Sequence, residues 1–185
     1  RPTVAVITNA QREHQEFLPS VEATAEENAD SIKALPADGV AVYPADDACA
    51  PIWEKASEHC RRRTYATQPG VSADLTAEVM TLGGTTEVRI HAAEGSAMTR
   101  LDIGGAHNGH NAAAAAAAAF SAGVKFDAVI QGLQAFKPVA RRGVRHQLRP
   151  ELLLIDDTYN ANPDSMRAGI DVLTSSRGPL VLIAG

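Results

Sequence analysis

The densest group of polar side chains in the sequence follows a short apolar run near its C-terminal end. Residues 152–155 are all aliphatic, and the positions after them include Asp157, Thr158 and Asn162. An apolar run without alternation predicts a strand buried on both faces, and Pro163 suits the first position of a following helix. Ligands of open α/β sheets bind at the carboxyl edge, where such a strand ends. These residues are therefore candidates for a binding site, but such side chains also cap helices and close turns.

A second candidate group lies just before a run of alanine. His107, His110 and Asn111 are three and four positions apart, so a helix beginning there places them on one face at its N-terminal end. That geometry suits an anion or a nucleotide base. Two imidazoles without a third ligand are weak grounds for a zinc site. The alternative is that Asn108 caps the helix and the histidines are solvated.

Two isolated residues complete the candidates. His14 lies five positions after Asn9 in the loop behind the first predicted strand, where a histidine can face a ligand crevice. Arg142 lies in a basic stretch and can bind a phosphate or close on a nucleotide. Either side chain can equally be solvated. The sequence has no GxSxG elbow, no cysteine paired with histidine and no GxxxxGK[ST] loop, so neither a covalent nucleophile nor the usual triphosphate cradle is indicated.

The elements that must position these residues begin with a parallel sheet. Strands are expected at residues 4–7 and 40–43 with a helix at 21–35 between them, which forms a βαβ unit. From residue 74 to residue 102 the pattern alternates as in strands, with a turn at 83–84, and predicts a small antiparallel ribbon. The N-terminal part is therefore predicted to combine a parallel sheet, flanking helices and this ribbon.

The remaining elements are predicted to be helices followed by a second unit. Unbroken alanine from 112 to 119 predicts a helix able to lie very close to a neighbouring backbone, and residues 126–136 predict another helix. Residues 141–145 are interpreted as a linker, and a further strand is expected at 180–183. The fold class is therefore α/β: a mostly parallel sheet with flanking helices and an antiparallel ribbon, then the start of a second Rossmann-like α/β domain. The expected domains are 1–147 and 148–185, with the boundary near Gln147.

Composition narrows the functional classes. The net charge of -5, with acidic and basic residues interspersed, argues against a nucleic-acid partner. No apolar stretch has the length of a membrane span and no secretory signal opens the chain, so a cytoplasmic protein without membrane insertion is expected. Cys49 and Cys60 are interpreted as reduced thiols. The chain starts without methionine and ends on a predicted strand, and it is therefore interpreted as a segment of a longer protein.

Taken together, the motifs resemble the Mur ligases of peptidoglycan synthesis, in order and in spacing. The resemblance spans essentially the whole chain and rests on ITN with His14, on GAHNGHNA at 105–112, on FKP with Arg142, and on DDTYNANPDSM at 156–166. The last string is similar to the family members that join D-Ala-D-Ala to UDP-MurNAc-tripeptide. The resemblance places residues 1–147 in the central ATPase domain and 148–185 at the start of the carboxyl-terminal ligase domain.

The resemblance implies an ATP-dependent amide-bond ligase that phosphorylates a carboxylate to an acyl phosphate, with Mg²⁺ offsetting charge on the transferring group. His14 is implied near the second magnesium site, and Arg142 reaches the nucleotide from the linker. Asn111 is implied to hydrogen-bond adenine, Asp157 to accept from the ribose hydroxyls. The other implied residues shape the same nucleotide site: His107, Asn108, Tyr159 and Asn162.

The sequence also departs from the family pattern. The family's phosphate-binding loop and magnesium-binding glutamate fall before Arg1, and Asn28 stands where many members carry a carbamylated lysine. The family's Gly-Arg pair appears as Arg141-Arg142. We therefore expect no turnover by these residues alone, and a monomeric full-length protein. The alternatives are a sister ligase of the kind that adds another amino acid or glutamate, and a noncatalytic nucleotide-binding module.

Overall fold

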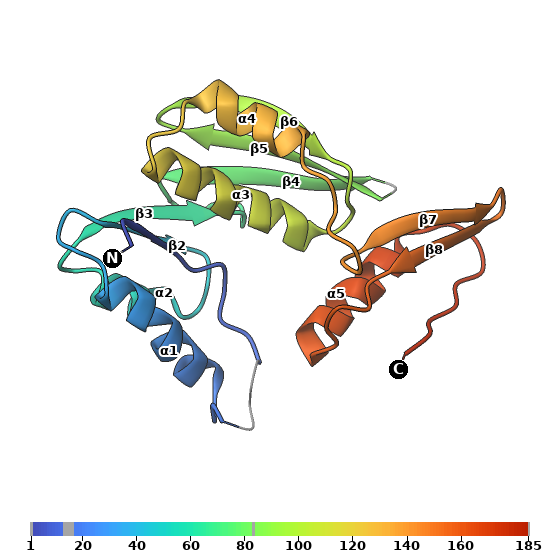
Figure 1. Cartoon of the computed structure of the whole chain (residues 1–185), viewed down its shortest axis with the longest axis horizontal. Coiled ribbons are helices and arrows are strands. Elements are labelled where there is room, and N and C mark those ends of the chain that lie inside the picture. The colour runs from blue at the N-terminus through green and yellow to red at the C-terminus, as the bar shows by residue number, and fades with distance from the viewer. Residues whose placement is uncertain (1, 13–16, 83, 185) are drawn as a thin grey trace.

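The computed structural model describes residues 2–12, 17–82 and 84–184 of the chain (Figure 1). His14, the predicted magnesium-site residue, lies outside these ranges. The described residues form a six-stranded sheet with four helices, followed by a two-stranded hairpin and a fifth helix. The chain is thus an α/β protein, as the sequence predicts.

The six-stranded sheet joins the two predicted patterns in one layer. Its strands lie in chain order, with β1 to β4 parallel and β4 to β6 antiparallel. They are β1 (Val4–Val6), β2 (Val40–Pro44), β3 (Arg61–Ala66), β4 (Leu75–Leu82), β5 (Thr85–Ala92) and β6 (Gly95–Leu101). The predicted ribbon is therefore the antiparallel continuation of the parallel sheet.

Helices cover both faces of this sheet (Figure 1). One face carries α1 (Val21–Lys33) and α2 (Ala50–Ala56), and the other carries α3 (Ala106–Ser121) and α4 (Phe126–Gln134). Alternate residues of strand β2 contribute to the cores on the two faces. Val40 and Val42 face the core under α3, whereas Ala41 and Tyr43 face the core under α1. All four are buried, as expected for a strand covered on both sides.

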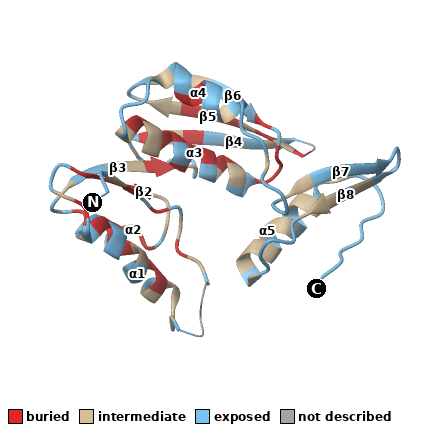
Figure 2. Ribbon diagram, viewed as in Figure 1, coloured by how far each residue is buried: buried red, intermediate tan, exposed pale blue. Residues whose placement is uncertain are grey.

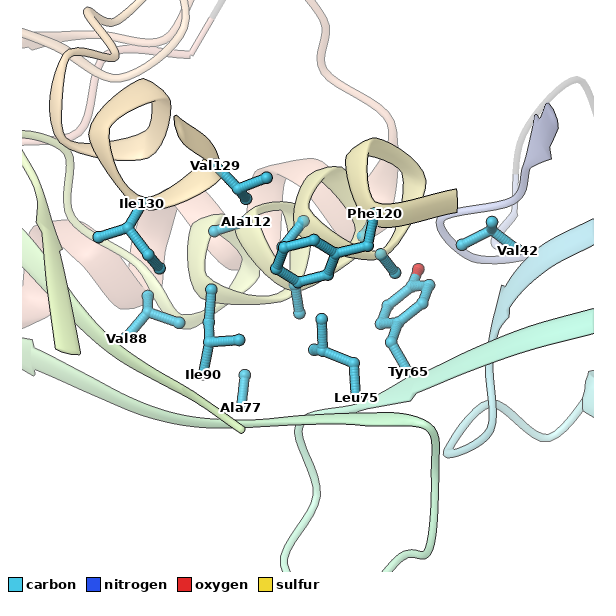
Figure 3. Close-up of a cluster of buried hydrophobic side chains, with 14 of the residues drawn as sticks. Val42, Tyr65, Leu75, Ala77, Val88, Ile90, Ala112, Phe120, Val129 and Ile130 are labelled. Carbon is cyan, nitrogen blue, oxygen red and sulfur yellow. The ribbon is translucent and has the colours of Figure 1, made fainter. Parts of the chain in front are cut away.

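The core under α3 explains the run of alanine. Val88 and Ile90 of β5 are fully buried and point toward α3 and α4, where Ala112 and Ile130 meet them (Figure 3). At Gly109 the helix comes so close to β4 that an added Cβ would lie 2.3 Å from Cγ1 of Val79. Larger side chains on this face would push the helix off the sheet, so small residues are what permits the contact.

The C-terminal part is built differently. Strands β7 (Val144–Arg149) and β8 (Leu152–Asp156) form an antiparallel hairpin, and α5 (Pro163–Thr174) follows. Figure 2 shows these elements as half-buried or exposed, in contrast to the buried positions of the six-stranded sheet. No residue of α5 is buried.

Several sequence predictions differ from this arrangement. The strand at 152–155 was expected to be buried on both faces, but Leu152 and Leu154 are 46% and 43% exposed because β8 pairs with β7 at the surface. The predicted linker runs into β7, and Gln147 pairs with Leu153 inside the hairpin. Strand β3 was missed because its first three residues are arginines.

The strand predicted at 180–183 is also wrong. These residues are exposed, Ile183 at 87%, and pair with no strand in the part of the chain that the structure describes. An apolar run becomes a strand only when a neighbouring strand accepts its hydrogen bonds, so the hydrophobic pattern alone was misleading here.

Candidate functional site

The N-terminal end of α3 lies at the carboxyl edge of the parallel strands, where α/β proteins bind ligands. His110 fixes it there, with Nε2 2.8 Å from the carbonyl oxygen of Thr8 after β1 and Nδ1 3.3 Å from the hydroxyl of Thr67 after β3. A carbonyl can only accept, so Nε2 carries the proton. The hydroxyl of Tyr65 donates to the carbonyls of Ile7 and Thr8 at 3.0 and 3.1 Å, and burial raises the pKa of this phenol. His110 therefore anchors the helix rather than facing a ligand with His107.

His107 is held in a neutral form at the start of α3. The amide nitrogen of Asn108 donates to the carbonyl of Gly104 at 2.8 Å and lies 2.9 Å from Nε2 of His107. Nε2 is therefore the acceptor, and the ring proton sits on Nδ1. Desolvation lowers the pKa of His107, while the carboxylate of Asp157 opposes that shift. Asp157 is thus close enough to act on the imidazole, although the two residues are far apart in the sequence.

The start of α3 was predicted differently in one respect. Gly105, and not Asn108, occupies the N-cap, with φ at 108° and no side-chain cap. An added Cβ on Gly105 would lie 2.5 Å from Cε1 of His107, so the ring folds back over this glycine.

Asn111 lies one turn further along α3 and is exposed. Its side chain makes no hydrogen bond with any residue in the described ranges. Both the donor and the acceptor of this amide are consequently available to a ligand. Such an amide can pair with the edge of a purine base.

A second group forms the corner that follows β8. Oδ1 of Asp156 accepts from the hydroxyl of Thr158 at 2.7 Å, and Nε and Nη2 of Arg141 donate to the hydroxyl and carbonyl of Thr158 at 3.1 and 3.0 Å. The guanidinium of Arg142 stacks 3.8 Å from the centre of the Tyr159 ring. Two of the predicted site residues therefore touch each other, and the predicted linker is attached to the acidic corner.

The polar residues of this corner have separate roles. Oδ1 of Asn162 accepts from the backbone nitrogen of Ser165 at 2.7 Å, so Asn162 caps α5. Asp157 takes no part in this cap. Its Oδ2 instead lies over the middle of α5, 3.1 Å from where a Cβ on Gly169 would be. The amide oxygen of Asn162 is used by the cap, whereas the carboxylate of Asp157 remains available to a ligand.

A cavity of about 370 Å³ separates the start of α3 from α5. His107 lines one side, and Asp171 and Val172 of α5 line the other. A methyl group of Val172 would lie 3.0 Å from a Cβ on Gly105, so the two helices meet at the floor of this space. The other lining residues are small: Thr81, Gly105, Ala106, Ala168 and Ser175.

The α5 side of the cavity was missed in the sequence. Ala168, Asp171, Val172 and Ser175 recur at helical spacing, which is the signal that would have placed them on one face. Nothing in their types distinguishes them from ordinary surface residues of a helix.

Two further findings concern metals and membranes. Within the described residues, no group of three or more histidine, cysteine, aspartate or glutamate side chains is arranged to hold a metal ion. His14, the predicted metal residue, lies outside the described ranges. Across the same part of the chain, the helices are too short or too polar to cross a bilayer.

Comparisons with known proteins give the family. Residues 1–119 match the model of the Mur ligase middle domain. The UDP-N-acetylmuramoyl-tripeptide--D-alanyl-D-alanine ligase of Escherichia coli is 34% identical over 187 residues, an alignment that covers 100% of this chain and 41% of that protein. The Bacillus subtilis ligase of the same description is 33% identical, over 96% of this chain and 37% of its own length.

Solved structures agree with the sequence matches. A crystal structure of MurF from Acinetobacter baumannii superimposes with a TM-score of 0.89 at 30% identity, covering 96% of this chain and 38% of that one. MurF from Thermotoga maritima, solved in complex with ADP, shares the fold at a TM-score of 0.80 and 23% identity. The chain spans about two fifths of the length of these relatives. Because residues 1–119 match the middle-domain model and the Escherichia coli ligase aligns with the whole chain, the chain belongs to the Mur ligase family.

Proposed function

We propose that this chain supplies the adenosine-binding part of an ATP-dependent ligase of the MurF type. In this proposal the complete protein joins D-Ala-D-Ala to UDP-MurNAc-tripeptide through an acyl phosphate. The D-alanyl-D-alanine ligases among the relatives support this substrate pair. The ADP complex of the Thermotoga protein supports the nucleotide. The single observation that carries the site is the cavity between α3 and α5, which His107 lines from one helix and Asp171 and Val172 line from the other.

Each residue has a proposed task at the nucleotide. The free amide of Asn111 pairs with the adenine edge, and neutral His107 with Asn108 forms the wall beside the base. The Asp157 carboxylate accepts from the ribose hydroxyls, since an ionised carboxylate is an acceptor only. Arg142 offers its charge to the phosphates from the stack on Tyr159, next to the α5 cap that Asn162 makes.

ATP would supply the phosphoryl group that activates the substrate carboxylate, and Mg²⁺, for which the family resemblance implies His14, would offset its charge. The chain's own contribution is alignment. The neutral His107 keeps a positive charge away from the base. Asp157 binds the ribose and Arg142 binds the phosphates, which aligns the nucleotide.

The organisation of the complete protein is part of the same proposal. Residues 1–147 belong to the central ATPase domain, and 148–185 begin a Rossmann-like carboxyl-terminal domain. The complete protein is proposed to work in the cytoplasm as a monomer. The stretch from Arg141 to the β7–β8 hairpin connects the two parts. The side chain of Arg141 binds it to the corner after β8.

Calorimetric titration of ADP tests the nucleotide proposal. Asn111→Ala is expected to weaken ADP binding about three- to tenfold, the range of one neutral hydrogen bond. Asp157→Asn is expected to weaken ADP more than a nucleotide whose ribose lacks both hydroxyls. Gln131→Ala and Asp127→Asn on exposed positions of α4 are the matched controls and should bind as the parent chain does. Unchanged affinity in both site variants would contradict the proposed site.

The ligase proposal needs the complete protein. With UDP-MurNAc-tripeptide and ATP, phosphate release is expected to depend on D-Ala-D-Ala. Release that depends instead on a single amino acid would assign a sister activity. ADP binding without release under any of these conditions would leave a nucleotide-binding module.

A further inference from the structure

An ion pair, distinct from the stack of Arg142 on Tyr159, joins the two parts of the chain. Arg12, in the loop after β1, donates to Asp164 in the first turn of α5 through Nη2 at 2.5 Å, Nε at 3.1 Å and its backbone nitrogen at 3.3 Å. The two residues are 152 positions apart. Two guanidinium nitrogens meet two carboxylate oxygens, which fixes direction as well as distance.

Within residues 2–12, 17–82 and 84–184, few other direct contacts join α5 to the six-stranded sheet. None of its residues is buried, so the helix does not share the hydrophobic core. Val172 approaches Gly105 at the floor of the cavity. Helix α5 is nevertheless one whole side of that cavity, and its position sets the distance from His107 to the opposite wall.

We propose that Arg12 and Asp164 are positioning residues, which hold α5 against the carboxyl edge of the sheet in the place where it completes the nucleotide cavity. This inference rests on the proposed function, since it concerns the same cavity. Neither side chain lines the cavity, so the pair acts on the ligand through the placement of α5.

The electrostatic setting favours this role. Asp164 stands in the first turn of α5, where the helix dipole stabilises a negative charge. The hydrogen bonds with Arg12 lower the pKa of Asp164 and raise that of Arg12, with Arg167 adding a weaker effect on the carboxylate. The side chains of Arg12 and Asp164 are 43% and 21% exposed, so salt partly screens the pair.

The test is the affinity for ADP in Arg12→Ala and Asp164→Asn. Both substitutions are expected to weaken ADP about two- to fivefold at low salt, the range of a partly exposed ion pair. High salt is expected to weaken the parent chain toward the level of the variants. Asp164→Glu keeps the carboxylate and should retain most of the affinity. Arg62→Ala, which breaks the exposed pair between Arg62 and Glu54, is the control and should have no effect.

Asp164→Asn also distinguishes positioning from direct binding. If Arg12 contacted the phosphates itself, removing its partner would free the guanidinium and strengthen ADP binding. Stronger or unchanged binding in Asp164→Asn would therefore overturn the proposal.

Amide hydrogen exchange separates this inference from the proposed function. Arg12→Ala is expected to speed exchange in α5, although Arg12 lies outside that helix, and to leave α3 unchanged. This result would hold even if the parent chain bound no ADP, which would overturn the nucleotide proposal alone. Equal exchange in α5 of parent and Arg12→Ala would overturn the positioning role.

Discussion

Helices α3 and α5 face each other across one cavity but are held in opposite ways. Seven residues of α3 are buried, five of them alanine, whereas no residue of α5 is buried. Helix α3 is fixed by close contact with the sheet, whereas within the described ranges α5 is held by the Arg12–Asp164 pair and by an apolar contact of Val172 at Gly105. One wall of the candidate site is therefore rigid, and the other depends on polar contacts that substitutions and salt can weaken.

The largest contrast is expected between apolar truncations in the two regions. Ile90→Ala removes a fully buried side chain under α3 and should lower the free energy of unfolding by about 2–5 kcal/mol. Leu154→Ala in β8, 43% exposed, should cost less than about 1 kcal/mol. Urea denaturation of both variants measures the difference. Equal losses would mean that the hairpin is packed as tightly as the sheet.

Two glycine-to-alanine substitutions sharpen the comparison, because each adds one methyl group to a different helix. Gly109→Ala forces a methyl group against Val79 and should destabilise the chain by about 1–3 kcal/mol. Gly132→Ala in α4 has no atom within 4 Å and should stabilise it by about 0.5–1 kcal/mol through helix propensity. Thermal unfolding of the two variants should shift in opposite directions. A stabilising Gly109→Ala would contradict the close contact between α3 and β4.

Gly169→Ala applies the same change to α5, where we expect the affinity for ADP to change more than the stability of the chain. The added methyl group would lie 3.1 Å from Oδ2 of Asp157, so the carboxylate must move by a few tenths of an ångström. Because α5 is at the surface, stability should change by less than about 1 kcal/mol. Affinity for ADP should nevertheless fall, as measured by calorimetry. Unchanged affinity would indicate that the position of Asp157 does not matter for the nucleotide.

The smallest predicted effect concerns the influence of Asp157 on the pKa of His107. Asp157→Asn removes the charge that opposes desolvation, so the pKa of His107 should fall further below its ordinary value. Nuclear magnetic resonance titration of the ring protons measures it, with His107→Gln for assignment and Asp127→Asn as the control. An unchanged pKa in Asp157→Asn would place Asp157 away from the imidazole.

The same pKa has a consequence for stability. The folded pKa of His107 lies below the unfolded value of about 6.5, so between the two values the unfolded state binds more protons. The contribution of His107 to stability is therefore complete above about pH 6.5 and is lost as the pH falls toward the folded pKa. In Asp157→Asn this window should extend to lower pH.

Much of the fold could be predicted from local patterns. The alanine run predicted α3 and Pro163 predicted the start of α5, because propensity and capping act within a few residues. Strand β3 was missed, because three arginines hide a strand whose burial begins only at Tyr65. The strand at 180–183 was predicted wrongly, because pairing depends on neighbours that a hydrophobic pattern does not contain.

The candidate site was predictable in its residue types more than in its contacts. The sequence singled out His107 and Asp157, and in the structure the Asp157 carboxylate raises the pKa of His107 against the larger effect of desolvation. The pair of Arg12 and Asp164 could not be predicted, since neither residue belongs to a motif and only the fold brings the two together. Asp171 was missed because an acidic residue on an exposed helix is ordinary.

The most direct measurement is to map ADP binding by the resonance shifts of the isotope-labelled chain. If adenosine lies between α3 and the corner after β8, the largest shifts should fall on the side-chain amide of Asn111 and on the backbone of Asp157 and Val172. Shifts gathered instead at the pocket beside Arg63 and Phe120, at the opposite end of α3, would contradict the account.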